Sequence, residues 1–496
     1  MIAERGPRAV APWVIGGAVA AVLVALSGRY GYHRDELYFL LCARHLAWGY
    51  VDQGPLTPAI AWLAQAVAPD SLVALRFPSA LLAGASVVLV GAIARELGAR
   101  PAAQTFAALV AAMSGAVLVS GHLLTTTTPD VTLWLAAVLC TVRVLRTGDT
   151  RWMLGTGLAI GVGMLNKPLP ALLGVSLVAG VLIAGPRRLL RDRWVLAAAG
   201  IAVLLALPYA IWQAVHGFPQ LGVAGQIAGG DSSYSGRGTA LLLQFLIISP
   251  YAVPVWLAGL VALLRRESWR PYRALAWAFF VALAIVLVAG GKGYYDAPLL
   301  LALTAAGAVP TVDWATRVLR RAAVPAGLVA GVVTAATAAV LLLPTLPGDR
   351  LPGFVVAANY DSGETVGWPA FADSLATAYR GLPASERARA VILTGNYGEA
   401  GAVARYGPDR GLPRAYSGHN SMAGFGVPPA NADVVIAVGY DSPVVLRRWF
   451  TDVRRAGRID ERVSTDNDEN GGPVWVCRGL RRSWPSIWRT EVAHTG

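Results

Sequence analysis

The sequence predicts a polytopic α-helical membrane protein with a smaller α/β domain at its C-terminus. Three observations support this fold class. Of the 496 residues, 55% are hydrophobic and only 14% are charged, whereas soluble domains are about one quarter charged. The mean hydropathy is +0.52. Long apolar runs recur up to about residue 345, and beyond that point the composition becomes that of a soluble domain.

The apolar runs are long enough to cross a bilayer, because a membrane-spanning helix needs about 20 mainly apolar residues. We expect about 11 transmembrane helices. They cover residues 10–27, 72–94, 102–120, 131–147, 152–165, 168–185, 194–214, 239–264, 273–289, 297–312 and 323–344. The two short segments 152–165 and 168–185 meet at Asn166-Lys167-Pro168 and are typical of a broken helix beside a polar region.

Arginine marks one side of the membrane. The loops on the side of the N-terminus hold 18 arginines, which the positive-inside rule assigns to the cytoplasm. The N-terminal run resembles a signal peptide, but ten further apolar segments follow it, so we interpret it as a retained first helix. The net charge of +13 therefore reflects topology and not nucleic-acid binding, because no base-stacking module is visible.

The chain divides by composition into two parts. Residues 1–346 form the predicted transmembrane catalytic domain, with a catalytic first outer loop at 28–71. Residues 347–496 form the soluble α/β domain, which the odd number of helices places outside the cytoplasm. Its short apolar runs predict strands, and the stretches between them predict helices. The strands are expected at 390–394, 433–438 and 473–477, and the helices at 369–380, 398–406 and 443–456.

Three carboxylates lie in the first outer loop, within the stretches 30–39 and 49–58. They are Asp35, Glu36 and Asp52. Carboxylates this close to hydrocarbon are costly and usually functional, and one of them is suited to act as a general base toward an acceptor hydroxyl. The alternative is that Asp35 and Glu36 only cap an amphipathic helix, since acidic residues favour helix N-termini.

Lysine is rare, and both lysines fall in predicted outer loops. Of 42 basic residues, only Lys167 and Lys292 are lysine. An ammonium beside phenols and backbone amides is suited to bind a lipid phosphate, so we predict a donor phosphate site at Lys167, Lys292, Tyr294 and Tyr295. The alternatives are snorkelling for Lys167 and an interfacial aromatic belt for the tyrosines.

Other polar residues of the outer loops are predicted to contact the acceptor or line the pocket. They are Tyr32, His33, Tyr38, Gln53, His122, Asp130 and His216. His216 with a carboxylate could bind a divalent cation, but no spacing motif requires a metal, and the three cysteines form no ligand pattern. Two motifs of the C-terminal domain, 396–399 and 417–421, either face the acceptor or are turn chemistry.

These motifs resemble one known family. Tyr-x-x-Asp-Glu-Leu-Tyr-Phe, Tyr-Val-Asp-Gln-Gly-Pro-Leu, Asn-Lys-Pro and Gly-Lys-Gly-Tyr-Tyr are similar to motifs of the bacterial branch of glycosyltransferase family 39. This branch belongs to the GT-C superfamily, with the protein O-mannosyltransferases and the lipid A aminoarabinose transferase. The resemblance covers about residues 10–345, and the C-terminal region looks like the soluble tail of the same branch.

The resemblance implies an inverting transferase of the bacterial plasma membrane that uses a polyprenyl-monophosphate sugar at the outer face. Its acceptor would be an envelope lipid, glycan or protein. Asp35 matches the catalytic aspartate, and Glu36 its acidic neighbour. Asp52 falls where the aminoarabinose transferase has a glutamate, and Gln53 where it has a lysine associated with donor phosphate, so we assign that role to Lys167 or Lys292. No cofactor is required, although a divalent cation is compatible with the site.

Two other classes of protein remain as alternatives. A transporter or lipid flippase would also have many helices, broken segments and intramembrane charges, but paired repeats and acids near the bilayer midplane would be expected. A non-catalytic membrane receptor would leave the polar residues of the outer loops unexplained. Both alternatives are weaker predictions than the transferase.

Overall fold

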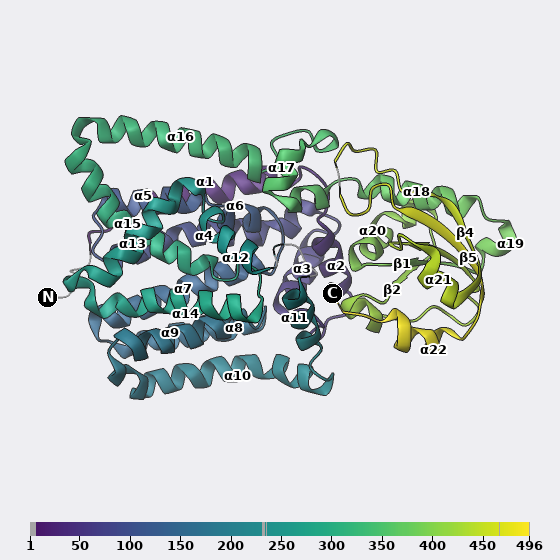
Figure 1. Cartoon of the computed structure of the whole chain (residues 1–496), viewed down its shortest axis with the longest axis horizontal. Helices are drawn as coiled ribbons and strands as arrows, with labels where there is room; N and C mark the ends of the chain where they lie inside the picture. The colour runs from purple at the N-terminus through teal and green to yellow at the C-terminus, as the bar shows by residue number, and fades with distance from the viewer. Residues whose placement is uncertain (1–5, 231–233, 235, 466, 496) are drawn as a thin grey trace. The chain divides into compact units, whose positions relative to one another are not determined.

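The computed structural model describes residues 6–230, 234, 236–465 and 467–495. It divides into two compact units (Figure 1). The helical unit comprises Met1–Ser27, Gln53–Leu56 and Arg76–Ala339, and the sheet unit comprises Gly28–Asp52, Thr57–Leu75 and Val340–Gly496. The first five residues, which belong to the predicted cytoplasmic N-terminus, lie outside the described residues.

This division differs from the one that composition indicates. The sequence assigns the loop 28–71 to the membrane domain and places the boundary at residue 346. Contacts instead group most of that loop with the C-terminal region. The loop is polar and rich in aromatic residues, and most of it packs with the C-terminal region although apolar helices flank it.

The helical unit is built from long apolar helices. Their bounds are α1 Ala11–Leu26, α4 Leu72–Glu96, α5 Pro101–Ala112, α6 Gly115–His122, α7 Thr127–Thr147, α8 Met153–Met164, α9 Leu169–Ala184, α10 Arg193–Val215, α11 Pro219–Gly229, α12 Arg237–Leu246, α13 Val253–Arg265, α14 Arg273–Ala289, α15 Ala297–Val318 and α16 Ala323–Leu342. The division between the two units falls inside α4 and α16. Helix α8 packs on α10, and α9 packs on α14.

Within the described residues, six helices are long and apolar enough to cross a membrane, or up to eight if each bent pair is one span. The expected helix 102–120 is the pair α5 and α6, bent by 52°, and the expected helix 239–264 is the pair α12 and α13, bent by 74°. The second bend is at Ser249, which precedes Pro250 and is extended with ψ 140°, as a following proline favours. The chain is therefore a multi-pass membrane protein by length and composition of its helices.

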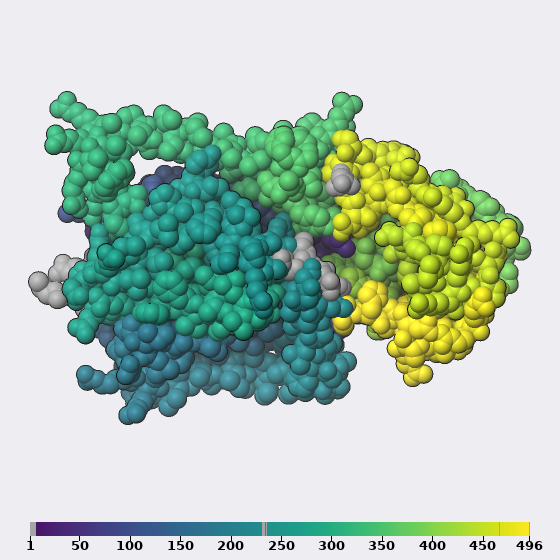
Figure 2. Space-filling view, in the orientation of Figure 1, coloured from purple at the N-terminus to yellow at the C-terminus, as the bar shows by residue number. Residues whose placement is uncertain are grey.

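Helix α16 stands out for its exposure. Only 6% of its most apolar stretch is buried inside the protein, and Figure 2 shows an open gap between this helix and its neighbours in the helical unit on the face drawn. An apolar helix with so little protein around it is typical of a lipid-facing segment.

The sheet unit contains eight helices and five strands among the described residues. The helices are α2 Arg34–Ala43, α3 Leu56–Val67, α17 Gly353–Ala358, α18 Trp368–Arg380, α19 Ala384–Arg387, α20 Tyr397–Tyr406, α21 Pro443–Trp449 and α22 Trp484–Ile487. The strands are β1 Ala390–Thr394, β2 Ala415–Ser417, β3 Val434–Val438, β4 Phe450–Arg458 and β5 Pro473–Leu480. The strand order is β2-β1-β3-β5-β4.

The sheet is mixed. Strand β1 pairs in parallel with β2 and β3, while β5 pairs antiparallel with β3 and β4. Every residue of β1 and β3 is buried, as expected for central strands covered on both faces. The three predicted strands correspond to β1, β3 and β5, which confirms the small C-terminal sheet.

The predicted helix 443–456 is wrong in its second half. Helix α21 ends at Trp449, and Phe450 begins the edge strand β4, which pairs with β5. The strand is mostly exposed and carries several arginines, so its composition resembles that of a solvent-facing helix. Charged side chains are common on edge strands, where they discourage association with other sheets.

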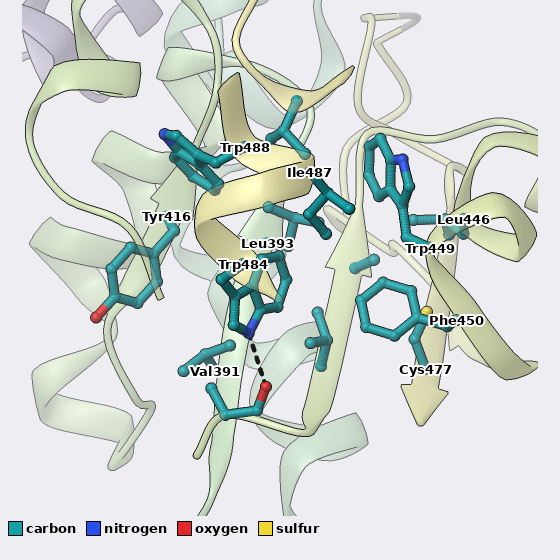
Figure 3. Packing of buried hydrophobic residues seen from close by; sticks show 14 residues of the cluster. Val391, Leu393, Tyr416, Leu446, Trp449, Phe450, Cys477, Trp484, Ile487 and Trp488 are labelled. Atoms are coloured by element: carbon teal, nitrogen blue, oxygen red, sulfur yellow. Dashed lines mark hydrogen bonds between the residues drawn. The ribbon is translucent and has the colours of Figure 1, made fainter. Parts of the chain in front are cut away.

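Tryptophans dominate the core of the sheet unit (Figure 3). Trp449, Trp484 and Trp488 pack with Leu393 of β1 and Cys477 of β5. The indole N–H of Trp484 donates to the backbone carbonyl of Ala432 at 2.8 Å, which satisfies the polar atom of a buried ring. This core supports the strands whose ends carry the polar residues described next.

Candidate active site

Helix α2 begins with a capping box that orients the predicted catalytic loop. The backbone N–H of Asp35 donates to Nδ1 of His33 at 3.1 Å, and the backbone N–H of His33 donates to Oε2 of Glu36 at 2.8 Å. Glu36 is fully buried, and Asp35 is half-buried. Reciprocal caps of this kind stabilise a helix N-terminus. The capping alternative therefore accounts for Glu36 and His33, and it leaves the side chain of Asp35 for another role.

Two carboxylates of the loop each accept a hydrogen bond from a tyrosine. The hydroxyl of Tyr397 donates to Oδ1 of Asp35 at 2.8 Å, and the hydroxyl of Tyr38 donates to Oδ1 of Asp52 at 2.8 Å. The two tyrosine rings are stacked, with centroids 4.6 Å apart and an interplanar angle of 28°. Asp35 and Asp52 are thus brought into one cluster, which the sequence predicts.

The two motifs of the C-terminal domain also join this cluster. Tyr397 belongs to the motif 396–399, and its ring stacks on His419 of the motif 417–421 with centroids 4.7 Å apart. His419 in turn stacks on His494 at 5.0 Å. The hydroxyl of Ser421 accepts the backbone N–H of Val51 at 2.9 Å. Both motifs therefore contact the first loop or its partners.

The electrostatics keep these phenols protonated. Burial, followed by the charge of Asp35, holds the pKa of Tyr397 well above its ordinary value. Burial and Asp52 do the same to the pKa of Tyr38. Burial, with His494 and Arg34 nearby, lowers the pKa of His419 to about 3. At neutral pH the tyrosines are therefore hydrogen-bond donors and the imidazole of His419 is neutral.

Arg34 links the loop to carboxyl groups of the C-terminal region. Its guanidinium lies 3.1 Å from the buried Glu364 and 3.0 Å from the exposed Asp468, and it sits over the ring of Tyr397 at 5.6 Å from the centroid. Burial is the main cause that raises the pKa of Glu364 to about 7 and that of Glu469 to about 8. Glu364 and Glu469 are therefore partly protonated near neutral pH.

Tyr32, a predicted pocket residue, has a packing role in the structure. Its hydroxyl donates to the backbone carbonyl of Asp70 at 3.0 Å, and the guanidinium of Arg405 lies 5.6 Å from its ring centroid. Arg405 also lies 3.7 Å from the carboxylate of Asp70. These contacts hold the two ends of the loop and helix α20 together.

A second group of predicted residues meets in the helical unit. The side-chain amide of Asn166 donates to Oδ1 of Asp130 at 2.9 Å and to the carbonyl of Thr126 at 2.6 Å. The positive charge of Lys167 acts on Asp130. Burial, followed by the charge of Asp130, raises the pKa of Tyr295 to about 12. Lys167 and Tyr295 are therefore each close enough to Asp130 to interact with its charge, although Asp130 lies within α7 and not in a loop.

Gln53 is held beside this group by its backbone. The N–H of Gly54 donates to the carbonyl of Asn166 at 2.9 Å, and the N–H of Leu56 donates to the carbonyl of Leu165 at 2.9 Å. Within the described part of the chain, several buried polar atoms near here have no hydrogen-bond partner: both amide atoms of Gln53, Oδ2 of Asp130 and both ring nitrogens of His122. Buried groups of this kind are costly unless something else satisfies them.

The Gly-Lys-Gly-Tyr-Tyr motif forms the link between α14 and α15. Lys292, Tyr294 and Tyr295 are half-buried. The rings of Tyr294 and Tyr295 meet edge to face, with centroids 5.2 Å apart. Next to the motif, the buried Asp296 accepts a hydrogen bond from the amide of Gln244 at 3.1 Å.

His216 differs from the other predicted pocket residues because it is exposed. It ends helix α10, with its ring stacked on Trp212 at 4.0 Å and its Nδ1 2.8 Å from the carbonyl of the same residue. Among the residues that the structure describes, no group of three or more His, Cys, Asp or Glu side chains is arranged to hold a metal ion. The divalent cation therefore stays a prediction.

The sequence does not indicate Tyr397 as a partner of Asp35, because the two residues are 362 positions apart. The only local signal is the capping box of α20, in which Asn396 accepts the N–H of Glu399 at 2.9 Å and Glu399 accepts the N–H of Asn396 at 3.1 Å. That signal predicts a helix start at Tyr397 and says nothing of what the tyrosine contacts.

Comparison with known proteins gives a family match and a fold. Residues 52–212 match the family model of dolichyl-phosphate-mannose-protein mannosyltransferase. Among curated proteins, no sequence match is significant. Among solved structures, the chain is similar to ArnT from Cupriavidus metallidurans bound to undecaprenyl phosphate, with 17% identity and a TM-score of 0.60 over 94% of this chain and 98% of that chain. The apo state of the same ArnT gives 17% identity and a TM-score of 0.58, covering 93% of this chain and 97% of that chain.

These matches confirm the resemblance predicted from the motifs. The family model matches residues 52–212, about a third of the chain, and the solved structures show that the chain shares the fold of ArnT over nearly its whole length. The chain is therefore similar to the dolichyl-phosphate-mannose-protein mannosyltransferases over that stretch, and its fold is mostly helical with a small sheet in the C-terminal region.

Proposed function

We propose that this protein is an inverting glycosyltransferase that moves a sugar from a polyprenyl-monophosphate donor to a hydroxyl of an envelope lipid, glycan or protein. The observation that carries the proposal is the carboxylate of Asp35, half-buried at the start of α2 and held by the hydroxyl of Tyr397. The family match and the GT-C fold support the class of reaction. The ArnT structure contains undecaprenyl phosphate, which supports the class of donor.

In the proposed step, Asp35 acts as the general base. It accepts the proton of the acceptor hydroxyl while the hydroxyl oxygen bonds to the anomeric carbon of the sugar. The bond between that carbon and the phosphate oxygen breaks on the opposite face. The electron pair of the broken bond stays with the polyprenyl monophosphate, so negative charge develops on the leaving group. A single displacement of this kind inverts the anomeric centre.

The leaving phosphate would be bound by cationic and phenolic groups of the helical unit. Lys167 and Lys292 supply ammonium groups, and Tyr294 and Tyr295 supply hydroxyls, that of Tyr295 with its pKa raised to about 12 by burial. Donors placed where charge develops stabilise the transition state. The unsatisfied amide of Gln53 is a further donor beside Asn166 and Lys167. Its neutrality distinguishes this site from one with a lysine at that position.

We place the reaction at the outer face of a bacterial plasma membrane. The support is the clustering of 18 arginines in the loops on the other side and the positive-inside rule. In this topology about 11 helices cross the bilayer, and the C-terminal domain lies outside the cytoplasm. No nucleotide is then needed, which agrees with the missing Gly-Lys-Ser/Thr loop that would bind nucleotide phosphates.

The test compares purified wild type with Asp35→Asn, using defined polyprenyl-phosphate sugars and extracted envelope acceptors. We expect wild type to transfer sugar and the variant to lose about 10²- to 10⁴-fold in rate, while both bind the donor equally. Equal transfer by the two proteins would remove Asp35 from the chemistry. If wild type instead moves donor lipid across vesicle membranes without transferring sugar, the protein is a flippase.

A further inference from the structure

The stacked pair Tyr38–Tyr397 assigns a role to the C-terminal domain. We propose that Tyr397 is a positioning residue for Asp35: its hydroxyl holds the carboxylate in the orientation in which it accepts the acceptor's proton. This inference rests on the proposed function, in which Asp35 is the base. It deepens that function by making a residue of the C-terminal domain part of the active site.

Asp35 is fixed at two points. Its backbone N–H donates to Nδ1 of His33 at 3.1 Å, which sets the start of the helix, and its Oδ1 accepts the hydroxyl of Tyr397 at 2.8 Å, which sets the side chain. A hydrogen bond to a carboxylate is among the stronger ones in proteins. Proton transfer is efficient only when base and hydroxyl meet in a defined geometry, so a carboxylate with one orientation is better suited to the role than a freely rotating one.

Tyr397 is itself held rigidly. Its ring lies between those of Tyr38 and His419, with centroids at 4.6 Å and 4.7 Å. Its backbone N–H donates to Nδ1 of His419 at 3.3 Å. The guanidinium of Arg34 covers the ring at 5.6 Å from the centroid. A side chain with this many contacts has little rotamer freedom, so it can transmit a fixed position to its partner.

Two glycines allow the approach of α20 to α2. A Cβ atom at Gly401 would lie 2.6 Å from Cβ of Leu37 and 2.9 Å from its carbonyl carbon. A Cβ atom at Gly398 would lie 2.8 Å from Cβ of Arg34. The helix that carries Tyr397 is therefore seated directly on the helix that carries Asp35. This close packing of the two helices supports a specific contact between Tyr397 and Asp35.

The second pair provides a matched control. Tyr38 donates to Asp52 at the same distance, 2.8 Å, as Tyr397 to Asp35. Tyr397→Phe and Tyr38→Phe each remove one hydroxyl and keep the ring stack. Tyr397→Phe removes the phenol from Asp35, whereas Tyr38→Phe removes it from Asp52 and also removes the contact of the Tyr38 hydroxyl with Ser421.

The experiment measures the pH dependence of carboxyl labelling. Wild type and both variants of the full chain are treated in detergent with a water-soluble carbodiimide and an amine, which modify protonated carboxyl groups. Peptide mass spectrometry then quantifies Asp35 and Asp52 separately. In Tyr397→Phe we expect the labelling midpoint of Asp35 to move up by about one pH unit and that of Asp52 to stay. In Tyr38→Phe we expect the labelling midpoint of Asp52 to move up by a similar amount and that of Asp35 to stay.

An unchanged Asp35 midpoint in Tyr397→Phe would overturn the proposal, and so would an equal shift of both carboxyls, which would mean that the loop has rearranged. Transfer assays on the same proteins separate this inference from the proposed function. For Tyr397→Phe we expect kcat to fall about tenfold, with the KM for the donor unchanged. If the labelling midpoints move as expected but wild type transfers no sugar from any donor, the positioning role stands and the proposed function fails.

Discussion

The carboxylates of the first loop and the polar groups around Gln53 differ in how they are partnered. In the sheet unit, the half-buried carboxylates of Asp35 and Asp52 each accept a phenol hydrogen bond, which orients them without a ligand. In the helical unit, both amide atoms of Gln53 and one oxygen of Asp130 have no hydrogen-bond partner within the described residues. Buried atoms without a partner also occur in the sheet unit, such as Nε2 of His419, so the contrast holds for these residues and not for the units as wholes. The group around Gln53 has unused donors and acceptors, as expected of a region that binds a polar molecule.

On the proposed mechanism, this difference separates two roles. Tyr397 would hold Asp35 in place before any substrate binds, and the unsatisfied groups around Gln53 would gain partners when the donor binds.

The largest effect concerns pH and the buried carboxyl groups of the sheet unit. Burial raises the pKa of Glu364 to about 7 and of Glu469 to about 8, whereas both titrate near 4.5 in the unfolded chain. The folded protein therefore binds more protons between these values, and its stability falls as pH rises through them. With the two groups titrating independently, we expect the free energy of unfolding to drop by about 6 kcal/mol between pH 5 and pH 8.5.

Thermal unfolding followed by tryptophan fluorescence at several pH values measures this drop. Glu469→Gln removes one titrating group and should flatten the curve. A melting temperature that rises from pH 5 to pH 8.5 would contradict this prediction, because it would show that the folded protein stabilises the charged form of these carboxyl groups.

The next effect concerns Lys167. Lys167→Met removes the ammonium beside Asp130, so we expect the affinity for polyprenyl monophosphate to fall about 10- to 100-fold, the value of one charge-assisted hydrogen bond. Native mass spectrometry or thermophoresis with the purified protein measures the Kd. The matched control is Arg188→Met, which removes an exposed cation from a predicted cytoplasmic loop. Equal losses of affinity in the two variants would show that the effect comes from the net charge of the protein and not from a contact of Lys167 with the phosphate.

A smaller effect concerns the close packing of α20 against α2. Gly401→Ala places a methyl group 2.6 Å from Cβ of Leu37, so we expect the free energy of unfolding to fall by about 1–3 kcal/mol. Gly424→Ala is the control, since a Cβ atom there meets nothing within 4 Å. The same loss in both variants, or none in Gly401→Ala, would mean that the two helices are not in close contact.

The smallest effect has the opposite sign. Gln53→Leu replaces a buried amide without partners by an apolar side chain of similar size. We expect the ligand-free protein to become more stable by about 1 kcal/mol, because the desolvation cost disappears. Donor binding should weaken in the same variant. A loss of stability would show that the amide of Gln53 already has hydrogen-bond partners in the ligand-free protein. Gln53 would then no longer differ from Asp35 and Asp52 in this respect.

The sequence was informative wherever the signal was local. The strand at 390–394 matches β1 residue for residue, because a fully apolar run between polar stretches has few other interpretations. The linker Asn166-Lys167-Pro168 separates α8 from α9 as expected. By contrast, β4 pairs with β5 and shows no apolar run, so the sequence pattern of 443–456 predicts a helix and not a strand.

The site shows the same limit. Asp35, Glu36 and Asp52 could be singled out from the sequence because charge beside apolar segments is rare. Their separate roles could not be, since the cap made by Glu36 and the phenol on Asp35 depend on contacts that form only after folding. Tyr397 lies in another part of the chain, and only the packing of α20 against α2 brings it to Asp35.

The central claim is that Asp35 acts as a base in a single displacement. The most direct measurement is the anomeric configuration of the product, determined by NMR after transfer from a polyprenyl-phosphate sugar of known configuration. The account predicts inversion, because the acceptor oxygen attacks the face opposite the departing phosphate. Retention of configuration would contradict it, since a carboxylate would then have formed a covalent bond to the sugar and acted as a nucleophile.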